Sequence, residues 1–169
     1  MQPTTSPLLD AIIQGWQDYQ EQLVAVLRPL TLEQLAFRVA PDLRSVGEIV
    51  THVIRGRAFW FAEVLKEGDD EMATIVHWND EGQLARTTAE CVHGLEVTWQ
   101  LIQDALSRWT PAELTVPIVL PWLGPEYPIT RAFVIWHLLE HDLHHGGELS
   151  HSLGMQGLVI KLPPPPPEH

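Results

Sequence analysis

The chain has 169 residues, of which 45% are hydrophobic and 19% charged, enough for one domain with a substantial core. Its formal net charge is −12 and its 10 lysines and arginines form no cluster, which argues against nucleic-acid and anionic-membrane partners. No segment approaches the roughly 18 to 20 apolar residues of a membrane span, and residues 1–10 lack a signal-peptide pattern. With Cys91 as the single cysteine, which we expect to be buried and inert, the sequence predicts a cytoplasmic protein.

The N-terminal half is predicted to contain two long helices. The first runs from Pro7 to Arg28 and buries one apolar stripe, made of Leu8, Leu9, Ile12, Ile13, Trp16, Tyr19, Leu23 and Leu27. Thr31 to Gln34 reads as a capping box that opens a short helical turn. A second capping box, Ser45 to Glu48, opens a helix that ends near Lys66, since Gly68 lies just beyond it.

The C-terminal half is predicted to contain two more long helices. The third helix starts at Asp80–Gln83 and runs to about Arg108, and Thr110–Glu113 caps another short turn. Residues 116–129 contain four prolines and form a loop, with room for a short hairpin around residues 122–125. Thr130 is the expected N-cap of the fourth helix, which runs to about Leu153 with Gly154 as its C-cap.

These elements predict an all-α fold, an antiparallel four-helix bundle without strands. The long connections after the first and third helices leave room for a helix order that differs from the chain order. We assign residues 1–158 to the bundle domain. Residues 159–169 contain five consecutive prolines, 163–167, which favour an extended, disordered tail.

Histidine is the informative outlier in the composition, because four of the nine histidines lie between His137 and His145. On a helix, the four-residue spacing of His141 and His145 places both imidazoles on one face, about 40° apart. Two such side chains can reach one metal ion, and a tetrahedral ion needs a further ligand from elsewhere. His52 is the best candidate, because it is the one histidine of the second helix and a facing helix should supply that ligand.

All three histidines lie at the edge of the apolar arc of their helix, with His145 nearest the core. A site shielded on one side and reachable on the other is typical of a catalytic metal with an open coordination position. The alternative is that these are ordinary polar residues at the boundary of the core, because the HxxxH spacing alone is common.

The residues 138–149, LLEHDLHHGGEL, resemble the HxxxH signature in the last helix of DinB-like (also called YfiT-like) proteins. Residues 45–52 are similar to the helix that carries the first ligand in that family, and the 31–35 turn and the Pro-rich loop before Thr130 also fit. The resemblance extends over nearly the whole chain, up to about residue 158. One departure is that the usual Arg-Gly-Gln after the last ligand is here Gly146-Gly147-Glu148, which removes a cation.

The resemblance implies a four-helix bundle, often dimeric, that binds a divalent metal through His52, His141 and His145. Zinc or nickel is the expected ion, although three imidazoles suit several transition metals. Some branches of the family carry out transferase and isomerase chemistry with a low-molecular-weight thiol such as bacillithiol or mycothiol. The resemblance therefore predicts a homodimer that acts on a small-molecule substrate and uses a metal and a thiol.

Further residues are candidates for the chemistry around the metal. Glu148 shares the face of the two helix-four ligands, so it could orient an imidazole or move a proton, and His137 could act as general acid or base. The alternatives are a solvated glutamate and a boundary histidine. Aromatic residues could form a wall that binds the cofactor or substrate, although ordinary bundle packing would also explain them: Trp60, Trp122, Tyr127 and Trp136.

Three functions remain open on this evidence. The first is a metal-dependent enzyme, either a thiol S-transferase, which the resemblance favours, or a hydrolase that activates water. The second is a non-catalytic metal-binding stress-response protein in which the ion stabilises the bundle. The third is a protein without metal that dimerises through its helices.

Overall fold

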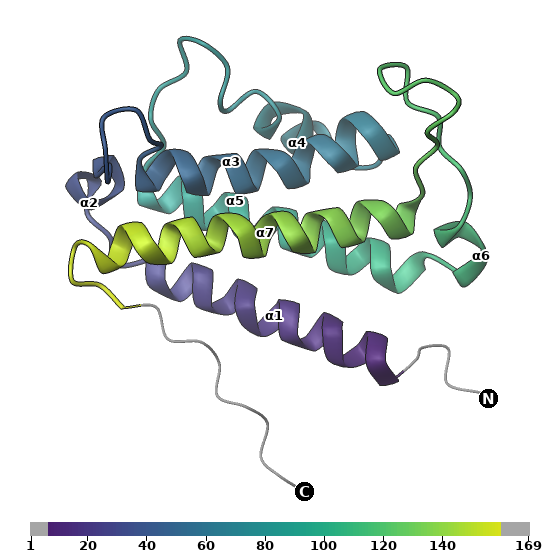
Figure 1. The fold of residues 1–169 in the computed structure, drawn as a ribbon, viewed down its shortest axis with the longest axis horizontal. Helices are drawn as coiled ribbons and strands as arrows, with labels where there is room; N and C mark the ends of the chain where they lie inside the picture. Colours follow the sequence, from purple (N-terminus) through teal and green to yellow (C-terminus); the bar gives the residue numbers. More distant parts are fainter. Residues whose placement is uncertain (1–6, 160–169) are drawn as a thin grey trace, which may run out of the picture.

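The computed structural model describes residues 7–159, apart from the side chain of Leu8 (Figure 1). Its long helices are α1 (Pro7–Leu27), α3 (Val46–Phe59), α5 (Thr88–Arg108) and α7 (Arg131–Gly154). The shorter elements are α2 (Leu32–Ala36), the π-helix η1 (Trp60–Leu65), α4 (Asp70–Ile75) and α6 (Pro111–Leu114). Among these residues the one β-type pairing is an isolated bridge between Ile118 and Ile129, so the predicted all-α four-helix bundle is confirmed.

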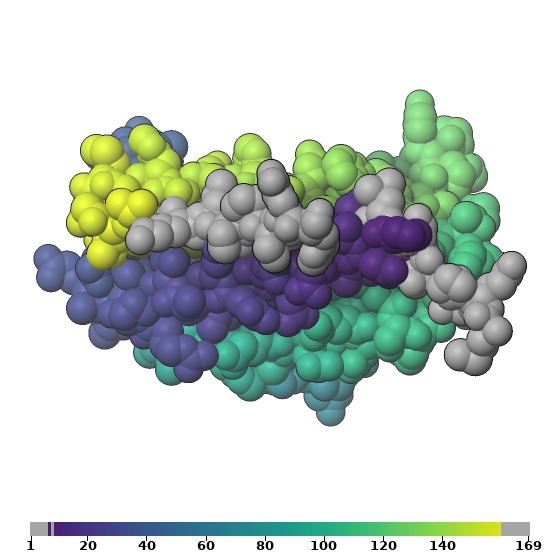
Figure 2. Space-filling view, turned by 90° about the horizontal axis from the view of Figure 1, so that it is seen from below, coloured from purple at the N-terminus to yellow at the C-terminus, as the bar shows by residue number. Residues whose placement is uncertain are grey.

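The long helices pack in the order α1, α5, α3, α7, which differs from their order in the chain. On the face shown in Figure 2, α1 (purple) lies between α5 (teal) and α7 (green to yellow). The chain directions are mixed: α1 and α7 run one way and α3 and α5 the other (Figure 1). The predicted antiparallel arrangement therefore holds for the pairs α1–α5 and α3–α7, whereas α3–α5 and α7–α1 are parallel neighbours. The long connections permit this order.

Side-chain capping explains most helix starts. The capping boxes at Thr31, Ser45 and Thr110 are all formed, and the Thr130 hydroxyl accepts a hydrogen bond from the Phe133 amide at 3.1 Å, as predicted. None of the described helices has the length and apolar character needed to cross a membrane. The predicted disordered proline tail falls on residues 160–169, which lie outside the described part of the chain.

The predicted start of the third helix is wrong. Residues 80–83 form a turn, with the Gln83 amide 3.1 Å from the Asp80 carbonyl oxygen, and Gly82 adopts a left-handed φ of 84° that ends helical geometry there. The helix begins instead after Thr87, whose capping box with Glu90 satisfies the first free amides. Two capping patterns lie within eight residues of each other, and the second one prevails because no glycine interrupts it.

The second helix reaches Leu65 as predicted, but its last turn is the π-helix η1. Lys66 ends it in the left-handed region at φ 57°, and Gly68 follows at φ 120°. The sequence prediction missed α4, in which the Asp69 side chain caps the first amides and Met72 and Ile75 are buried. At the C-terminus α7 includes Gly154, and the glycine with a left-handed φ is Gly157, so the predicted C-cap was also wrong.

The apolar stripe of α1 is buried only in its C-terminal part. Trp16, Leu23 and Leu27 are buried, whereas Leu9 and Ile12 remain 36% and 42% exposed. The predicted single buried stripe therefore fails over the first turns of α1. Cys91 is buried as predicted, and burial raises the pKa of its thiol to about 11, which makes it a poor nucleophile.

A fully buried ion pair lies at the centre of the bundle. Nη2 of Arg57 on α3 donates to Oδ2 of Asp142 on α7 at 2.6 Å, and both side chains are completely enclosed. Trp16 Nε1 on α1 donates to the same carboxylate at 2.7 Å. Arg57 Nη1 donates to Gln20 Oε1 at 2.9 Å, and the Gln20 amide in turn donates to the Leu95 carbonyl of α5 at 3.0 Å. This network, called the central network below, joins all four long helices.

We predict that Asp142→Ala lowers the free energy of unfolding by about 3–5 kcal/mol, because it leaves the Arg57 guanidinium charged and unpaired in the core. The double variant Arg57→Met/Asp142→Leu should recover most of that loss, since it removes both charges and refills the space. Urea unfolding followed by circular dichroism measures both. A double variant no more stable than Asp142→Ala would show that the penalty does not come from the unpaired charge.

Candidate metal centre

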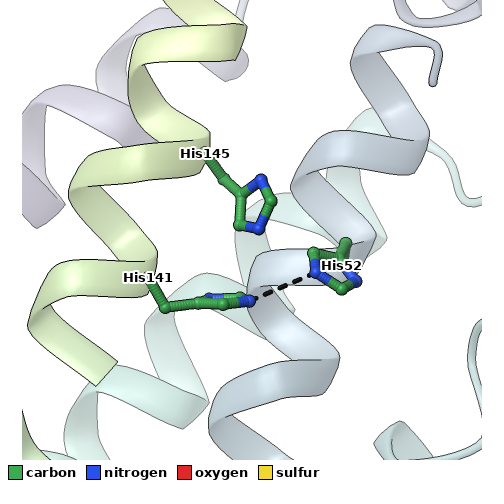
Figure 3. Close-up of side chains that lie close together, drawn as sticks. All are labelled: His52, His141 and His145. Carbon is green, nitrogen blue, oxygen red and sulfur yellow. Dashed lines mark hydrogen bonds between the residues drawn. The ribbon is translucent and has the colours of Figure 1, made fainter. Parts of the chain in front are cut away.

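The structure brings the three predicted ligand histidines together between α3 and α7 (Figure 3). The ring nitrogens that His52, His141 and His145 could offer a metal lie within 4.8 Å of one another. The closest pair is His141 Nε2 and His52 Nε2, which are 3.2 Å apart and share one hydrogen bond in this structure. His145 is nearly buried and the other two rings are partly exposed, so the cluster has a protected side and an open side, as predicted.

Two glycines make room for this arrangement. A Cβ at Gly56 would lie 2.9 Å from Cε1 of His141, so the missing side chain lets the imidazole rest against the backbone of α3. A Cβ at Gly146 would lie 1.5 Å from the Tyr19 hydroxyl oxygen, so the tyrosine of α1 occupies that space. Helix α7 is therefore held closely on two sides, by α3 at His141 and by α1 one turn later.

Glu148 orients His145. Its Oε2 lies 2.8 Å from Nδ1 of His145, one turn back along α7. With the proton on Nδ1, His145 donates to this carboxylate and keeps the Nε2 lone pair for a ligand, the arrangement that supports metal-bound imidazoles. The hydrogen bond from His145 lowers the pKa of Glu148, which keeps its carboxylate ionised at neutral pH. The contact supports the orienting role that the sequence suggested, and a role in proton transfer stays a prediction.

Two of the imidazoles are kept neutral by their surroundings. Burial lowers the pKa of His52 to about 4, and Arg44, His145 and Arg55 act in the same direction. Burial also lowers the pKa of His141 to about 3, with the neighbouring histidines adding to the effect. A metal-binding imidazole must be unprotonated. At neutral pH both nitrogens are therefore ready to bind a cation without first losing a proton.

The donor set fits a transition-metal ion. Two nitrogens bound to one tetrahedral ion at 2.0–2.1 Å are about 3.3 Å apart, close to the separation of the two Nε2 atoms. Nδ1 of His141 is buried and has no hydrogen-bond partner in the described part of the chain. A buried polar atom without a partner is costly, and ligation through Nε2 does not satisfy this one, since metal-bound imidazoles usually donate their second ring N–H to an acceptor. Neutral imidazoles suit zinc, nickel, copper or iron.

His137 lies at one end of the cluster, within a group of aromatic rings. Its ring centroid is 6.0 Å from that of His141 and 4.9 Å from that of Trp60, and it stacks in parallel on Phe133 at 5.9 Å. Trp60 is the first residue of η1, so the end of α3 and the start of α7 both contribute to this group. The predicted wall thus exists around His137 and Trp60, and Phe133 is a member that the sequence analysis did not identify.

The other predicted wall residues are less closely connected. The Trp122 ring lies 6.3 Å from that of Phe59 but is 59% exposed, so it extends the aromatic group outwards along the loop. Tyr127 is 65% exposed, and no ring contact among residues 7–159 connects it to the group. Trp136 is 61% exposed. The structure therefore brings Trp60 to the site, leaves Trp122 at its margin and does not place Tyr127 there.

Sequence reasoning missed the residues that hold the two ligand helices together. Arg57 follows Gly56 in the chain and Asp142 follows His141, so the central network adjoins the histidine cluster. The available signal was a pair of charges on the apolar faces of two helices: Asp142 lies four residues after Leu138 and three before His145, both of which are buried. Long-range pairing of this kind is not visible from either helix alone.

Comparisons with known proteins agree with this geometry. The sequence model of the DinB superfamily matches residues 16–149. A DinB-like protein from Bacillus cereus is 20% identical with a TM-score of 0.66, over 90% of this chain and 95% of that chain. A DinB-like protein from Bacillus subtilis is 18% identical with a TM-score of 0.64, over 90% and 96%. At these identities the two structures show a shared fold. A search of curated proteins finds no match.

The pKa values of His52 and His141, about 4 and 3, predict how the metal-free protein responds to acid. In the unfolded chain these histidines titrate near their ordinary pKa of about 6.5, so on acidification the unfolded state binds protons first. The free energy of unfolding should therefore fall from about pH 7 towards pH 4. The dependence should be flatter between pH 6.5 and 5 in His52→Gln/His141→Gln.

Urea unfolding at a series of pH values in the presence of a chelator measures this dependence. His151→Gln is the matched control, because it removes an exposed histidine near the end of the same helix α7. Equal pH dependence in the wild type and in His52→Gln/His141→Gln would show that the two rings are not held neutral.

Proposed function

The chain belongs to the DinB superfamily, and we propose that it is a metal-dependent enzyme whose divalent cation is bound by His52, His141 and His145. The observation that supports this most directly is the convergence of three ring nitrogens within 4.8 Å, on two helices that the central network holds in register. Zinc or nickel is the ion that we expect. The partial exposure of two of the rings leaves the site reachable by a small molecule.

A bound divalent cation supplies Lewis acidity, which lowers the pKa of a thiol or water molecule that reaches the site. The residues of the chain then have distinct tasks. Glu148 holds the His145 ring in one tautomer and orientation. His137, which is partly exposed, is placed to accept or return a proton at a ring nitrogen, and the aromatic rings of Trp60 and Phe133 limit its motion.

We favour a thiol S-transferase, in which a low-molecular-weight thiol attacks a carbon electrophile. The sulfur–carbon bond forms as the bond from carbon to its leaving group breaks, and the thiol proton passes to a base such as His137 or to solvent. This choice rests on the family resemblance, because the histidines alone would equally serve a hydrolase that activates water. A non-catalytic metal-binding stress-response protein is the remaining alternative, in which the same ligands only stabilise the bundle.

A homodimer and a cytoplasmic location are further proposals. Exposed apolar side chains on the first turns of α1, including Leu9 and Ile12, support self-association, because apolar surface of this kind is stabilised by burial in an interface. Light scattering on the purified protein gives its mass in solution and decides between one chain and two.

We predict that the purified, tag-free protein carries about one divalent metal per chain and that His145→Ala loses it while remaining folded. The ligand lies at the edge of the core, so its removal should leave the bundle intact. Elemental analysis by mass spectrometry measures the metal, and circular dichroism the fold. His52→Ala should behave in the same way.

The matched control is His151→Ala, an exposed histidine six residues further along α7, which should keep the full metal content. Stoichiometric metal in His145→Ala, or none in the wild type after incubation with zinc and nickel, would contradict the ligand assignment.

A second prediction separates thiol transfer from hydrolysis. The zinc-loaded protein should accelerate the reaction of a thiol with 1-chloro-2,4-dinitrobenzene, in which the new carbon–sulfur bond replaces the carbon–chlorine bond and chloride leaves. The acceleration should fall to the background rate in His145→Ala. Hydrolysis of 4-nitrophenyl acetate without thiol is the comparison, and acceleration of that reaction alone would favour the hydrolase.

A further inference from the structure

The arginines and lysines of this acidic chain are distributed unevenly. The described residues contain nine of the ten, since Lys161 lies outside them. Seven of these nine form ion pairs with aspartate or glutamate. The two that form no ion pair with any described residue are Arg44 and Arg55. In a chain with 22 acidic side chains, two cations left without a carboxylate partner need an explanation.

Both arginines flank the histidine cluster. Arg55 lies one helical turn after His52 on α3, and Arg44 immediately precedes Ser45, the N-cap of the same helix. The positive charge of each lowers the pKa of His52, and the charge of Arg44 also lowers that of Glu148. Because Arg44 precedes His52 along the chain and Arg55 follows it on α3, these two described cations lie on either side of that proposed ligand, with Arg44 towards the Glu148 end of the antiparallel helix α7.

The surroundings of Arg55 present its guanidinium to a ligand. Its Nε donates to the Val76 carbonyl at 3.0 Å, which anchors the side chain, and its central carbon lies 5.7 Å from the ring centroid of Phe59. No hydrogen bond to a described residue uses its two terminal nitrogens. Phe59 in turn contacts the rings of Trp60 and Trp122, so the guanidinium lies at the edge of the aromatic group. An anchored, planar donor pair is the arrangement that binds a carboxylate in two-point fashion.

Arg44 provides a second cation at the opposite end of the cluster. It is exposed, and it forms no ion pair with Glu148, whose Oε2 lies 2.8 Å from His145 Nδ1. No hydrogen bond or ion pair within residues 7–159 joins either guanidinium to one of the three histidines. The placement of both cations is therefore better explained by an anionic ligand than by the histidines themselves.

We propose that Arg44 and Arg55 bind carboxylate groups of the molecule that enters the metal centre, so that the site selects anionic over neutral thiols or substrates. This inference rests on the proposed function, since it assigns the charge of a ligand of that same site. Arg55 binds the group that lies nearest the aromatic rings, and Arg44 binds at the Glu148 end. Both act as specificity residues for the ligand.

The test uses two thiols of equal length, 3-mercaptopropionate and 3-mercapto-1-propanol, titrated into the zinc-loaded full-length protein by calorimetry. The carboxylate should bind about tenfold more tightly than the alcohol, the gain expected from one hydrogen bond between charged groups. Arg44→Gln should reduce this preference, and Arg44→Gln/Arg55→Gln should abolish it without changing the affinity for the alcohol. Arg55→Lys, which keeps a charge but not the planar donor pair, should retain part of it.

The matched control is Arg28→Gln/Arg108→Gln, which removes the same charge from exposed positions paired with other carboxylates and should keep the tenfold preference. Equal affinity for the two thiols in the wild type, or an undiminished preference in Arg44→Gln/Arg55→Gln, would overturn the proposal and leave the metal site standing. If the wild type binds no metal, the proposed function fails. The arginine proposal is then decided by the NMR signal of Arg55 Nε–H in the metal-free protein, where a shift with 3-mercaptopropionate supports it and no shift refutes it.

Discussion

The buried pair of Arg57 and Asp142 is the constraint on which the rest of this structure depends. Its charges are fully removed from solvent, so they are tolerable only while each hydrogen bond of the pair and of Trp16 and Gln20 is made. These bonds can form together only when α3 and α7 have one particular rotation and register. Because Gly56 and His141 are the immediate chain neighbours of the pair, that register also determines where the histidines meet.

The position of the histidine cluster thus depends on how the neighbouring helices pack against α7, as well as on the spacing of the histidines in the sequence. The four-residue interval puts His141 and His145 on one face of α7. The ring of His52 reaches them because α3 lies so close to α7 that position 56 must be a glycine. On the other side, Tyr19 fills the space that a side chain at position 146 would take. Burial keeps the rings of His52 and His141 neutral, and the Glu148 carboxylate holds His145 in orientation.

Much of this arrangement could be predicted from the sequence, because it depends on local patterns. Capping boxes located the starts of α2, α3 and α6, and helical periodicity with the histidine spacing indicated all three rings that converge. The errors arose where local signals compete or where the outcome depends on distant contacts. Residues 80–83 resembled a helix start but are interrupted by Gly82. Arg57 pairs with Asp142, 85 residues away in the chain. This pairing, and the absence of a carboxylate partner for two other arginines, can be identified only from the three-dimensional structure.

The π-helix at the end of α3 separates the histidine cluster from the aromatic residues beside it. In a π-turn each amide bonds to the carbonyl five residues back, so the turn is locally wider than in an α-helix. This wider turn begins at Trp60, downstream of His52, Gly56 and Arg57. The irregular turn therefore changes the direction of the side chains at the end of the helix, Trp60 among them, while His52 and the buried ion pair stay on regular α-helix. Variation in this turn alters the border of the cluster and leaves its centre unchanged.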